Sequence, residues 1–446
     1  MYAHGELRKS APANGAVLHA APRVIRLTFN QPPQLAFTRV ELVGPDSERV
    51  ALSPLRVAAS DSTEVVVADV AGPLRAGRYR ILWQITSTDG HPVRGVVAFS
   101  IAADATGLAI SAMDSAALPA LPPVMGDTTA PRVSGSPRSA TPAFDAGSWP
   151  YAVVRLLTFT AIMIVVGATV FAMVVVPGTR HRVPDLDATF AADARRSAAR
   201  LALAATGTLA LLLVARLVAQ SYAVRGTLPD ATFALGMART SWGAGFLLTA
   251  VSLAGLAIAL GRRRDAAWRV AALGALGLSL ATALSGHAAA SGRWATVAVF
   301  SDTVHILAAG GWLGALLLVI VAGVPATAAL QPSGRGLAVR GMVDVFSPLA
   351  LGFAAALAVT GVIAAVLRLG AWSALTGSDY GRVLLLKLGG VVLVLIAGAY
   401  NWRRMRPTLD ADRVGTLRRT ATVELLFGFV VLVVTAWLVA TPPPAE

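Results

Sequence analysis

The chain has 446 residues, of which 55% are hydrophobic and only 14% charged, and its mean hydropathy is +0.65. Soluble globular proteins carry about 25% charged residues, so this composition excludes an ordinary soluble enzyme and a disordered protein. The sequence contains no cysteine, which excludes disulfides, zinc fingers, iron–sulfur clusters and thiolate copper sites. Most of the net charge of +14 comes from arginines in short loops between apolar runs, so we attribute it to membrane topology and expect no nucleic-acid partner.

Residues 4–102 have the alternating pattern that is typical of β-strands. Apolar residues alternate with polar ones in several stretches, among them 25–29, 79–85 and 97–101, and turns rich in Pro, Gly and Asp separate these stretches. The pattern predicts a small antiparallel β-sandwich. Residues 103–148 are rich in Ala, Pro, Ser, Thr and Gly without periodicity, which predicts a flexible linker.

Residues 149–440 contain eight apolar runs, each about 20 residues or longer and therefore able to cross about 30 Å of hydrocarbon as a helix. The sequence thus predicts a helical membrane domain of eight spans, followed by an outer tail at 441–446. The runs fall near residues 151–176, 201–222, 241–260, 270–288, 301–324, 343–367, 383–401 and 420–440.

The arginines in the loops predict the orientation of these spans. The four loops on one side carry 17 basic residues, whereas the connections and the tail on the other side carry 5. The positive-inside rule places the basic loops in the cytoplasm, so the β-domain and both termini are expected outside a multi-pass inner membrane protein. An exported domain needs a signal sequence, and we interpret residues 1–3 as the remnant of one, with cleavage after Ala3.

Two pieces of the β-domain carry groups that suit Cu(II), which favours nitrogen and oxygen ligands in tetragonal geometry. Cleavage after Ala3 would make His4 the first residue, able to chelate through both its amine and its ring. Asp89 and His91 flank Gly90 in a predicted turn that could direct both side chains to one point. Taken alone, an Asp-Gly turn is most often structural, and a histidine near a terminus is most often solvated.

The amino-acid sequence around these residues resembles that of the CopC family of periplasmic copper-binding proteins. The resemblance covers about residues 4–102 and depends on the segments 4–18 and 87–95, which read HGELRKSAPANGAVL and STDGHPVRG. It implies a seven-stranded Greek-key sandwich that binds Cu(II) through an N-terminal histidine brace, with His4, Asp89 and His91 as ligands. Residues 1–3 would block that brace unless they are removed. The domain has no methionine-rich cluster, so no separate Cu(I) site is expected.

Charged side chains inside membrane spans are costly and are functional candidates by default. Asp302 and His305 are three residues apart and share a helix face, while His287 ends the fourth span, one short outer loop away. Two imidazoles and a carboxylate predict a site that receives copper near the outer surface. The alternative is an ordinary polar cluster that closes the helix bundle. The candidates are Arg155, Arg216, Asp302, His305, Lys387 and Glu424.

Two further intramembrane charges are given supporting roles. Lys387 lies one or two turns inside the seventh span and is expected to pair with Asp302. Glu424 lies near the cytoplasmic end of the last span, where we expect an ion pair at the helix end with Arg418 or Arg419.

The membrane part also resembles a known family, the CopD copper-resistance membrane proteins. The resemblance covers about residues 150–440 and implies eight spans and copper movement across the inner membrane. A CopC-like domain followed by a CopD-like domain is the order found in fused copper-import proteins. The segments that carry the resemblance are 286–288, 302–314, 346–350, 360–361 and 380–387, together with Asn401 before an arginine cluster.

The sequence therefore predicts a protein that captures Cu(II) outside and imports copper into the cytoplasm. We expect copper ions, the lipid bilayer and a periplasmic copper chaperone as partners, and no enzymatic activity. The chain has no nucleotide-binding P-loop, so transport is not powered by an ATPase of its own. Two alternatives stay open: a b-type haem electron carrier or cupric reductase that uses His287 and His305, and a copper chaperone for oxidase assembly.

Overall fold

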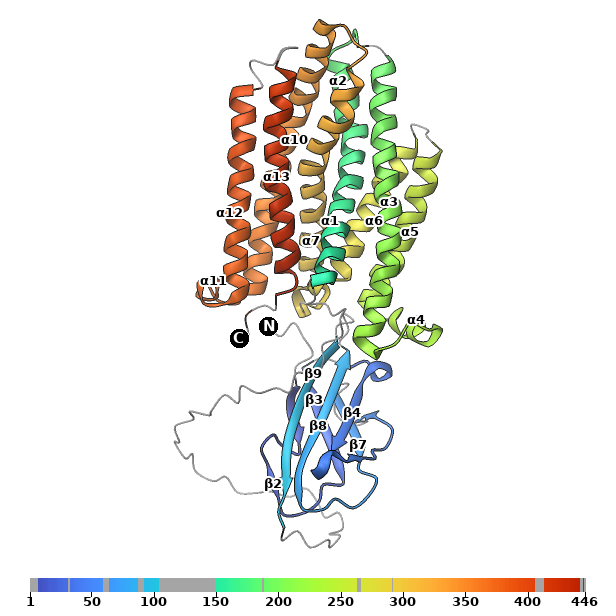
Figure 1. Cartoon of the computed structure of the whole chain (residues 1–446), viewed down its shortest axis with the longest axis vertical. Coiled ribbons are helices and arrows are strands. Elements are labelled where there is room, and N and C mark those ends of the chain that lie inside the picture. Colours follow the sequence, from blue (N-terminus) through green and yellow to red (C-terminus); the bar gives the residue numbers. More distant parts are fainter. Residues whose placement is uncertain are drawn as a thin grey trace. The chain divides into compact units, whose positions relative to one another are not determined.

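A computed structural model of the chain divides into two compact units, a β-domain and a helical domain, which are described separately (Figure 1). The predicted linker at 103–148 lies almost wholly outside the described residues, so its flexibility stays a prediction. The structure describes residues 7–30, 33–58, 64–86, 92–103, 149–186, 188–262, 266–290, 292–405 and 413–441, and residue 444.

The β-domain is a sandwich of two sheets. The first sheet has the strand order β1 (Leu7–Ala11), β3 (Val24–Phe29), β7 (Val65–Asp69) and β6 (Arg56–Val57). The second has the order β2 (Val17–Leu18), β9 (Pro92–Ile101), β8 (Gly77–Thr86), β4 (Arg39–Val43) and β5 (Arg49–Val50). The described residues thus form nine strands where the resemblance implied seven, and three of the nine have only two residues.

The apolar and polar residues that alternate in the sequence correspond to buried and exposed side chains of the sandwich. Ile25, Leu27 and Phe29 of β3 are at most 1% exposed, whereas Arg26 between them is exposed. Each fully buried side chain of this size contributes roughly 1.5–3 kcal/mol by leaving water. The antiparallel prediction is wrong for one short strand, because β2 pairs with β9 in parallel.

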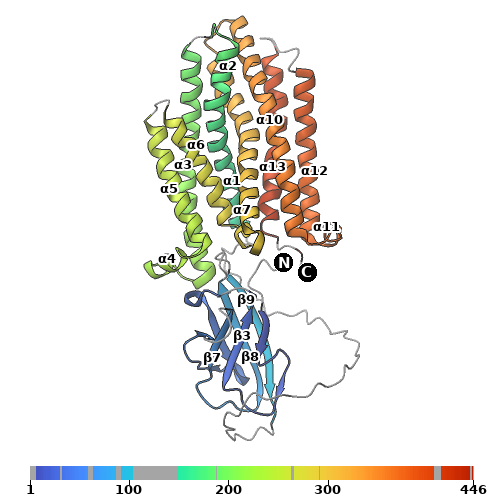
Figure 2. The same ribbon diagram turned by 180° about the vertical axis from the view of Figure 1, so that it is seen from behind.

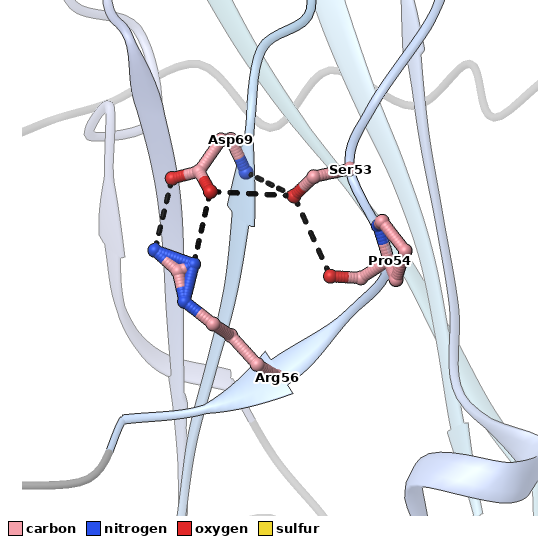
Figure 3. A network of polar contacts seen from close by, with 4 residues as sticks. All are labelled: Ser53, Pro54, Arg56 and Asp69. Carbon is pink, nitrogen blue, oxygen red and sulfur yellow. Dashed lines mark hydrogen bonds and ion pairs between the residues drawn. The ribbon is translucent and has the colours of Figure 1, made fainter.

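Asp69, the last residue of β7, anchors the connection between β5 and β6 (Figure 3). Its carboxylate accepts two hydrogen bonds from the Arg56 guanidinium, at 3.0 and 2.9 Å, and its backbone N–H donates to the Ser53 hydroxyl at 2.8 Å. About half of each charged side chain is exposed, so the ion pair contributes little to stability. We assign this network a structural role at the sheet edge.

Within its described residues, the helical domain has eight helices long and apolar enough to span a membrane, as the sequence predicts. The chain is therefore a multi-pass membrane protein. The spans are Trp149–Arg182 (α1 and α2), Thr189–Arg225 (in α3), Ser241–Gly261 (α5), Ala267–Leu284 (α6), Ala295–Ala326 (α7 to α9), Pro332–Leu369 (α10), Asp379–Arg404 (α12 and its extension) and Val414–Leu438 (α13).

Two helices are much longer than the apolar runs that predicted them. Helices α3 (Ala188–Arg225) and α10 (Pro332–Leu369) have 38 residues each, or about 57 Å at 1.5 Å per residue. Their N-terminal extensions carry arginines, such as Arg195 and Arg335, which lower hydropathy without breaking the helix. The sequence pattern therefore located the hydrocarbon-crossing part of each helix and missed the part that extends beyond it.

The fifth span packs tightly on the first. In the most apolar 18-residue stretch of the first and of the fifth span, 67% of the residues are buried. The corresponding shares in the sixth and seventh spans are 6% and 11%. Gly167 of α1 and Gly314 of the fifth span lie against each other, and a Cβ on either would collide with backbone atoms of the other helix. Small residues allow such close helix approaches in membranes. The fifth span is therefore a central element of the bundle.

The polar residues discussed below are distributed between the two ends of this bundle. Helix α1 (Trp149–Val170) begins, and α13 (Val414–Leu438) ends, at the same end of the bundle, as an even number of spans requires (Figure 1). The short helices α4 (Ala231–Met237) and α11 (Ala374–Gly377) lie at that end as well, and the view from behind agrees (Figure 2). We call it the α4 end.

Candidate functional site

The predicted Cu(II) ligands of the β-domain, His4, Asp89 and His91, lie outside the described residues. Strand β8 ends at Thr86 and β9 begins at Pro92, so the segment with two of these ligands connects two neighbouring strands. The Cu(II) site itself stays a prediction.

Trp83 stiffens the strand pair that carries this segment. Its ring packs edge-on against Phe29 of the opposite sheet, with ring centroids 5.3 Å apart. Gly95 of β9 faces the indole so closely that a Cβ there would overlap the ring. The side chain is 8% exposed, and its indole nitrogen has no hydrogen-bond partner among the described residues. The indole therefore packs closely on β9, the strand that follows the 87–91 segment, and on the opposite sheet.

In the helical domain, Asp302 of α7 (Ala295–Ala309) forms an ion pair with Arg368 near the end of α10. An Arg368 guanidinium nitrogen donates to a carboxylate oxygen of Asp302 at 2.9 Å, and the two side chains are 27% and 26% exposed. Tyr380 at the start of α12 (Asp379–Tyr400) also interacts with Arg368. Three spans are thus joined by one network near the α4 end of the bundle.

The prediction that Lys387 pairs with Asp302 is wrong. Both side chains are described, and Arg368 rather than Lys387 lies within ion-pair distance of the carboxylate. Lys387 is near enough for its charge to act on Asp302 and on His305. Arg368 was missed because the hydropathy pattern ended the sixth span at residue 367 and assigned this arginine to a loop.

His305 lies one turn further along α7 and is held through one ring nitrogen. Its Nδ1 is 2.8 Å from the Thr360 hydroxyl oxygen. That hydroxyl donates a hydrogen bond to the Ala356 carbonyl oxygen at 2.7 Å. Because that hydroxyl gives its only proton to the carbonyl, we infer that it accepts a proton from Nδ1–H. Nε2 then carries the lone pair, which is the form of imidazole that binds a metal.

The third residue of the predicted copper-receiving site is described only in its backbone. His287 begins the short helical segment His287–Ala290, and its side chain lies outside the described residues. Among the side chains that the structure describes, no three His, Cys, Asp or Glu residues form a group that could hold a metal ion. The structure places Asp302 and His305 on one helix and leaves the third ligand a prediction.

A second polar cluster surrounds Glu424 of α13. This carboxylate is 4% exposed and accepts hydrogen bonds from the Trp312 indole at 3.2 Å and from Asn401 Nδ2 at 2.9 Å. The predicted ion pair with Arg418 or Arg419 is wrong, since within the described residues the carboxylate bonds to Trp312 and Asn401 and to neither arginine, and both arginines are exposed. Residues five or six positions apart project from different faces of a helix.

The comparisons with known families match both parts of the chain. Residues 7–102 match the CopC domain, residues 145–297 match the copper resistance protein D-like N-terminal domain, and residues 340–438 match copper resistance protein D.

Individual relatives match either one part or the whole length. Copper transport protein CutJ of Bacillus subtilis is 24% identical over 457 residues, covering 100% of this chain and 75% of that protein. Copper resistance protein C of Pseudomonas syringae pv. tomato is 35% identical over 103 residues, covering 22% of this chain and 81% of that protein.

Protein YobA of Escherichia coli is 31% identical over 101 residues, covering 23% of this chain and 81% of that protein. Among solved structures, PcoC, a methionine-rich copper resistance protein from Escherichia coli, is 34% identical over 22% of this chain and 98% of its own, with a TM-score of 0.20. The chain therefore belongs to the CopC and CopD copper resistance and transport family, with a CopC domain at 7–102 followed by CopD-type membrane domains within 145–438.

Proposed function

We propose that this protein captures Cu(II) outside the membrane with its CopC domain and imports copper into the cytoplasm through its CopD-type bundle. The observation that carries the proposal is the presence of both domains in one chain, similar over its full length to a copper transport protein. A binding domain joined to a membrane bundle has a simple physical advantage, because tethering raises the concentration of captured metal at the bundle.

Capture depends on His4, Asp89 and His91. An amine, two imidazoles and one carboxylate supply the nitrogen-rich, oxygen-containing set that Cu(II) prefers. Such a site requires that His4 be the first residue of the mature chain.

Transfer depends on His287, Asp302 and His305 near the α4 end of the bundle. A metal ion enters the membrane only where ligands replace its water shell. The lone pair on His305 Nε2 supplies one ligand, and Asp302 supplies negative charge, part of which Arg368 neutralises while no copper is bound. Lys387 and Arg368 also act on His305, which weakens cation binding there and favours release, as conduction requires.

The proposal includes an orientation. The α4 end faces outside, since the basic loops gather at the opposite end. The host membrane is the inner membrane, and copper reaches the CopC domain from a periplasmic chaperone. A reporter fused after residue 446 should then be read in the outer compartment. A cytoplasmic reading would contradict this orientation.

Copper uptake by the full chain in proteoliposomes tests the import proposal. Copper should accumulate inside, and His287→Ala or His305→Ala should abolish accumulation, while Asp302→Asn should do less damage because it keeps an oxygen donor. His181→Ala, at an exposed histidine of α2 (Val176–Arg182), is the matched control and should transport at the parental rate.

Parental rates in both histidine variants would overturn the proposed transfer site. Binding without accumulation by the parental protein would favour a chaperone, and a haem absorption band in the purified protein would favour an electron carrier.

Electron paramagnetic resonance of Cu(II) bound to the processed protein, which begins at His4, tests capture separately. The spectrum should show nitrogen-rich tetragonal ligands, and His91→Ala should remove one nitrogen. His19→Ala is the matched control, because His19 is an exposed histidine of the same domain. An unchanged spectrum in the His91 variant would contradict the ligand assignment.

A further inference from the structure

Glu424 is a buried carboxylate that forms no ion pair with any positively charged side chain of the described residues. Within the described part of the chain it makes no ion pair, and its two hydrogen bonds come from the neutral groups of Trp312 and Asn401. Burying an ionised carboxylate in a membrane span costs several kcal/mol unless a cation balances it. Glu424 therefore either holds a proton or faces a passing cation.

Asn401 can form a hydrogen bond with this carboxyl in both its ionised and its protonated state. It begins the π-helical segment Asn401–Met405 that continues α12, and its Nδ2 donates to Glu424. Its Oδ1 is buried and has no hydrogen-bond partner among the described residues. A carboxylate only accepts hydrogen bonds, whereas a protonated carboxyl also donates one. Rotation of the Asn401 amide by half a turn would present Oδ1 to that new donor.

Space at the carboxyl is kept open by Gly398, one turn before Asn401. A Cβ at Gly398 would lie 3.2 Å from Glu424 Oε1, closer than most such contacts. Any larger residue would press on the carboxyl, so the glycine leaves room for the amide and the carboxyl to rearrange.

The cluster is connected to the proposed copper-receiving site through the fifth span. Asp302 and His305 are three residues apart on α7, and Trp312 follows seven residues after His305, in the π-helical segment Gly310–Gly314 that continues α7. Only the last three of those seven residues are π-helical, so the three side chains stay on roughly the same side of the span. Trp312 lies about 10 Å beyond His305 along the helix axis, at 1.5 Å per residue. A cation that moves inward past His305 on this side therefore approaches the carboxyl that Trp312 contacts.

We propose, on the basis of the proposed copper transport, that Glu424 is a proton-exchange site on the inward part of the path, and that the Asn401 amide serves both of its protonation states. As copper passes, the carboxyl O–H bond breaks, its electron pair stays on the carboxylate, and the proton goes to water on the side from which copper came. When copper has left inward, the carboxylate forms the O–H bond again with a proton taken from water on the side to which copper went, so that side loses one proton in each cycle. The carboxylate charge then offsets the charge of the cation. Proton and copper occupancy oppose each other, and by linkage each lowers the affinity for the other.

The arginines that lie near Glu424 or Asn401 in the sequence are exposed, so Glu424 is the ionisable group that we assign to the buried cluster. Arg403 and Arg404 after Asn401, and Arg418 and Arg419 on α13, are all exposed. Within the described residues, the contacts of the Glu424 carboxylate are the hydrogen bonds from Asn401 and Trp312, and the side chain is buried. Oxygen donors are hard ligands that suit a proton better than they suit Cu(I).

The test uses the full chain in proteoliposomes that contain a pH-sensitive dye, with copper added outside. For the parental protein, copper should enter and the lumen should become more alkaline. Glu424→Gln should let copper enter without that pH change, since glutamine keeps the size and the polar contacts but cannot exchange a proton. Asp379→Asn removes an exposed carboxylate and should leave both readings unchanged.

The outcomes separate the two proposals. A parental protein that admits no copper would overturn the transport proposal. Copper entry without alkalinisation, or equal alkalinisation in the Glu424→Gln protein, would overturn the proton exchange alone.

Infrared spectroscopy of the purified chain keeps the inference testable if the Glu424→Gln protein does not fold. A carboxyl band should titrate in the parental protein, and copper should reduce it. Asn401→Leu should shift its midpoint, since leucine offers neither state a partner. A carboxyl band that changes neither with copper nor with the Asn401→Leu substitution would refute the proton exchange.

Discussion

The two polar networks of the bundle hold a carboxylate inside the membrane in opposite ways. Asp302 is matched by the guanidinium of Arg368 at 2.9 Å, whereas the donors to Glu424 among the described residues are the neutral N–H groups of Trp312 and Asn401. In the first network the carboxylate is paired with a guanidinium, and the network joins three spans. The second is unbalanced, so its charge can change when a proton leaves. The contrast implies that the same substitution, carboxylate to amide, should have different effects at the two places.

The largest expected effect comes from the element that carries residues of both networks. Gly314→Ala would drive a methyl group into the Met163 carbonyl oxygen of α1. We expect a loss of about 3 kcal/mol, at the upper end for overpacking, because backbone cannot move aside easily. Thermal unfolding in detergent measures this loss. Gly352→Ala, where a methyl group meets open space, is the control, and equal losses would contradict the close packing.

Breaking the balanced network should be the next largest effect. Arg368→Leu leaves Asp302 without its partner and should cost about 2–3 kcal/mol, less than the ~3–5 kcal/mol of fully buried pairs because both side chains are partly exposed. Adding Asp302→Asn should recover part of the loss. Arg382→Leu, in an exposed ion pair with Asp379, should cost at most about 1 kcal/mol. No recovery in the double variant would argue against a direct pair.

Amide substitution sharpens the comparison directly. Asp302→Asn leaves the Arg368 charge unpaired and should cost about 2 kcal/mol. Glu424→Gln removes no ion pair and keeps an oxygen acceptor, so it should cost about 1 kcal/mol or less. Chemical unfolding of the two variants side by side gives the difference. A greater loss at Glu424 would mean that this carboxylate has a cationic partner after all.

A smaller effect is expected at the hydroxyl that orients His305. Thr360→Val removes the acceptor for Nδ1–H and should cost about 1 kcal/mol, while copper uptake falls because the ring loses its fixed tautomer. Thr360→Ser keeps the hydroxyl and should retain uptake. Parental uptake by the valine variant would show that Thr360 does not position the ring.

The smallest effect belongs to an exposed carboxylate outside both networks. Asp230 caps α4, and a hydrogen bond from the Phe233 N–H, with further bonds from Thr232 and Arg225, lowers its pKa to about 2. Since this pKa lies below the unfolded value of about 3.9, the stabilisation is present above that pH. It is lost as pH falls toward about 2. Asp230→Ala should flatten the acid dependence of unfolding in that window, and an unchanged profile would contradict the cap.

Much of the architecture was predictable, because it depends on local patterns. The period-two alternation in β3 and β8 specified which side chains face the sandwich core, and apolar length specified eight spans. The partners of the intramembrane charges were predicted poorly. Lys387 was predicted as the ion-pair partner of Asp302, but the partner is Arg368. Arg418 or Arg419 was predicted as the partner of Glu424, but the carboxylate bonds to Asn401 and Trp312.

The division into a β-domain and a membrane domain, the number of spans and the charged residues inside them can be read from the order of amino acids alone. These follow from hydrophobicity and periodicity, which act within a few residues or against a uniform solvent. The contact of Arg368 with Asp302, 66 positions away, and that of Trp312 with Glu424, 112 positions away, became known from the folded arrangement of the helices. Such pairs depend on which helices are neighbours and on their rotation, and packing across the whole bundle sets both.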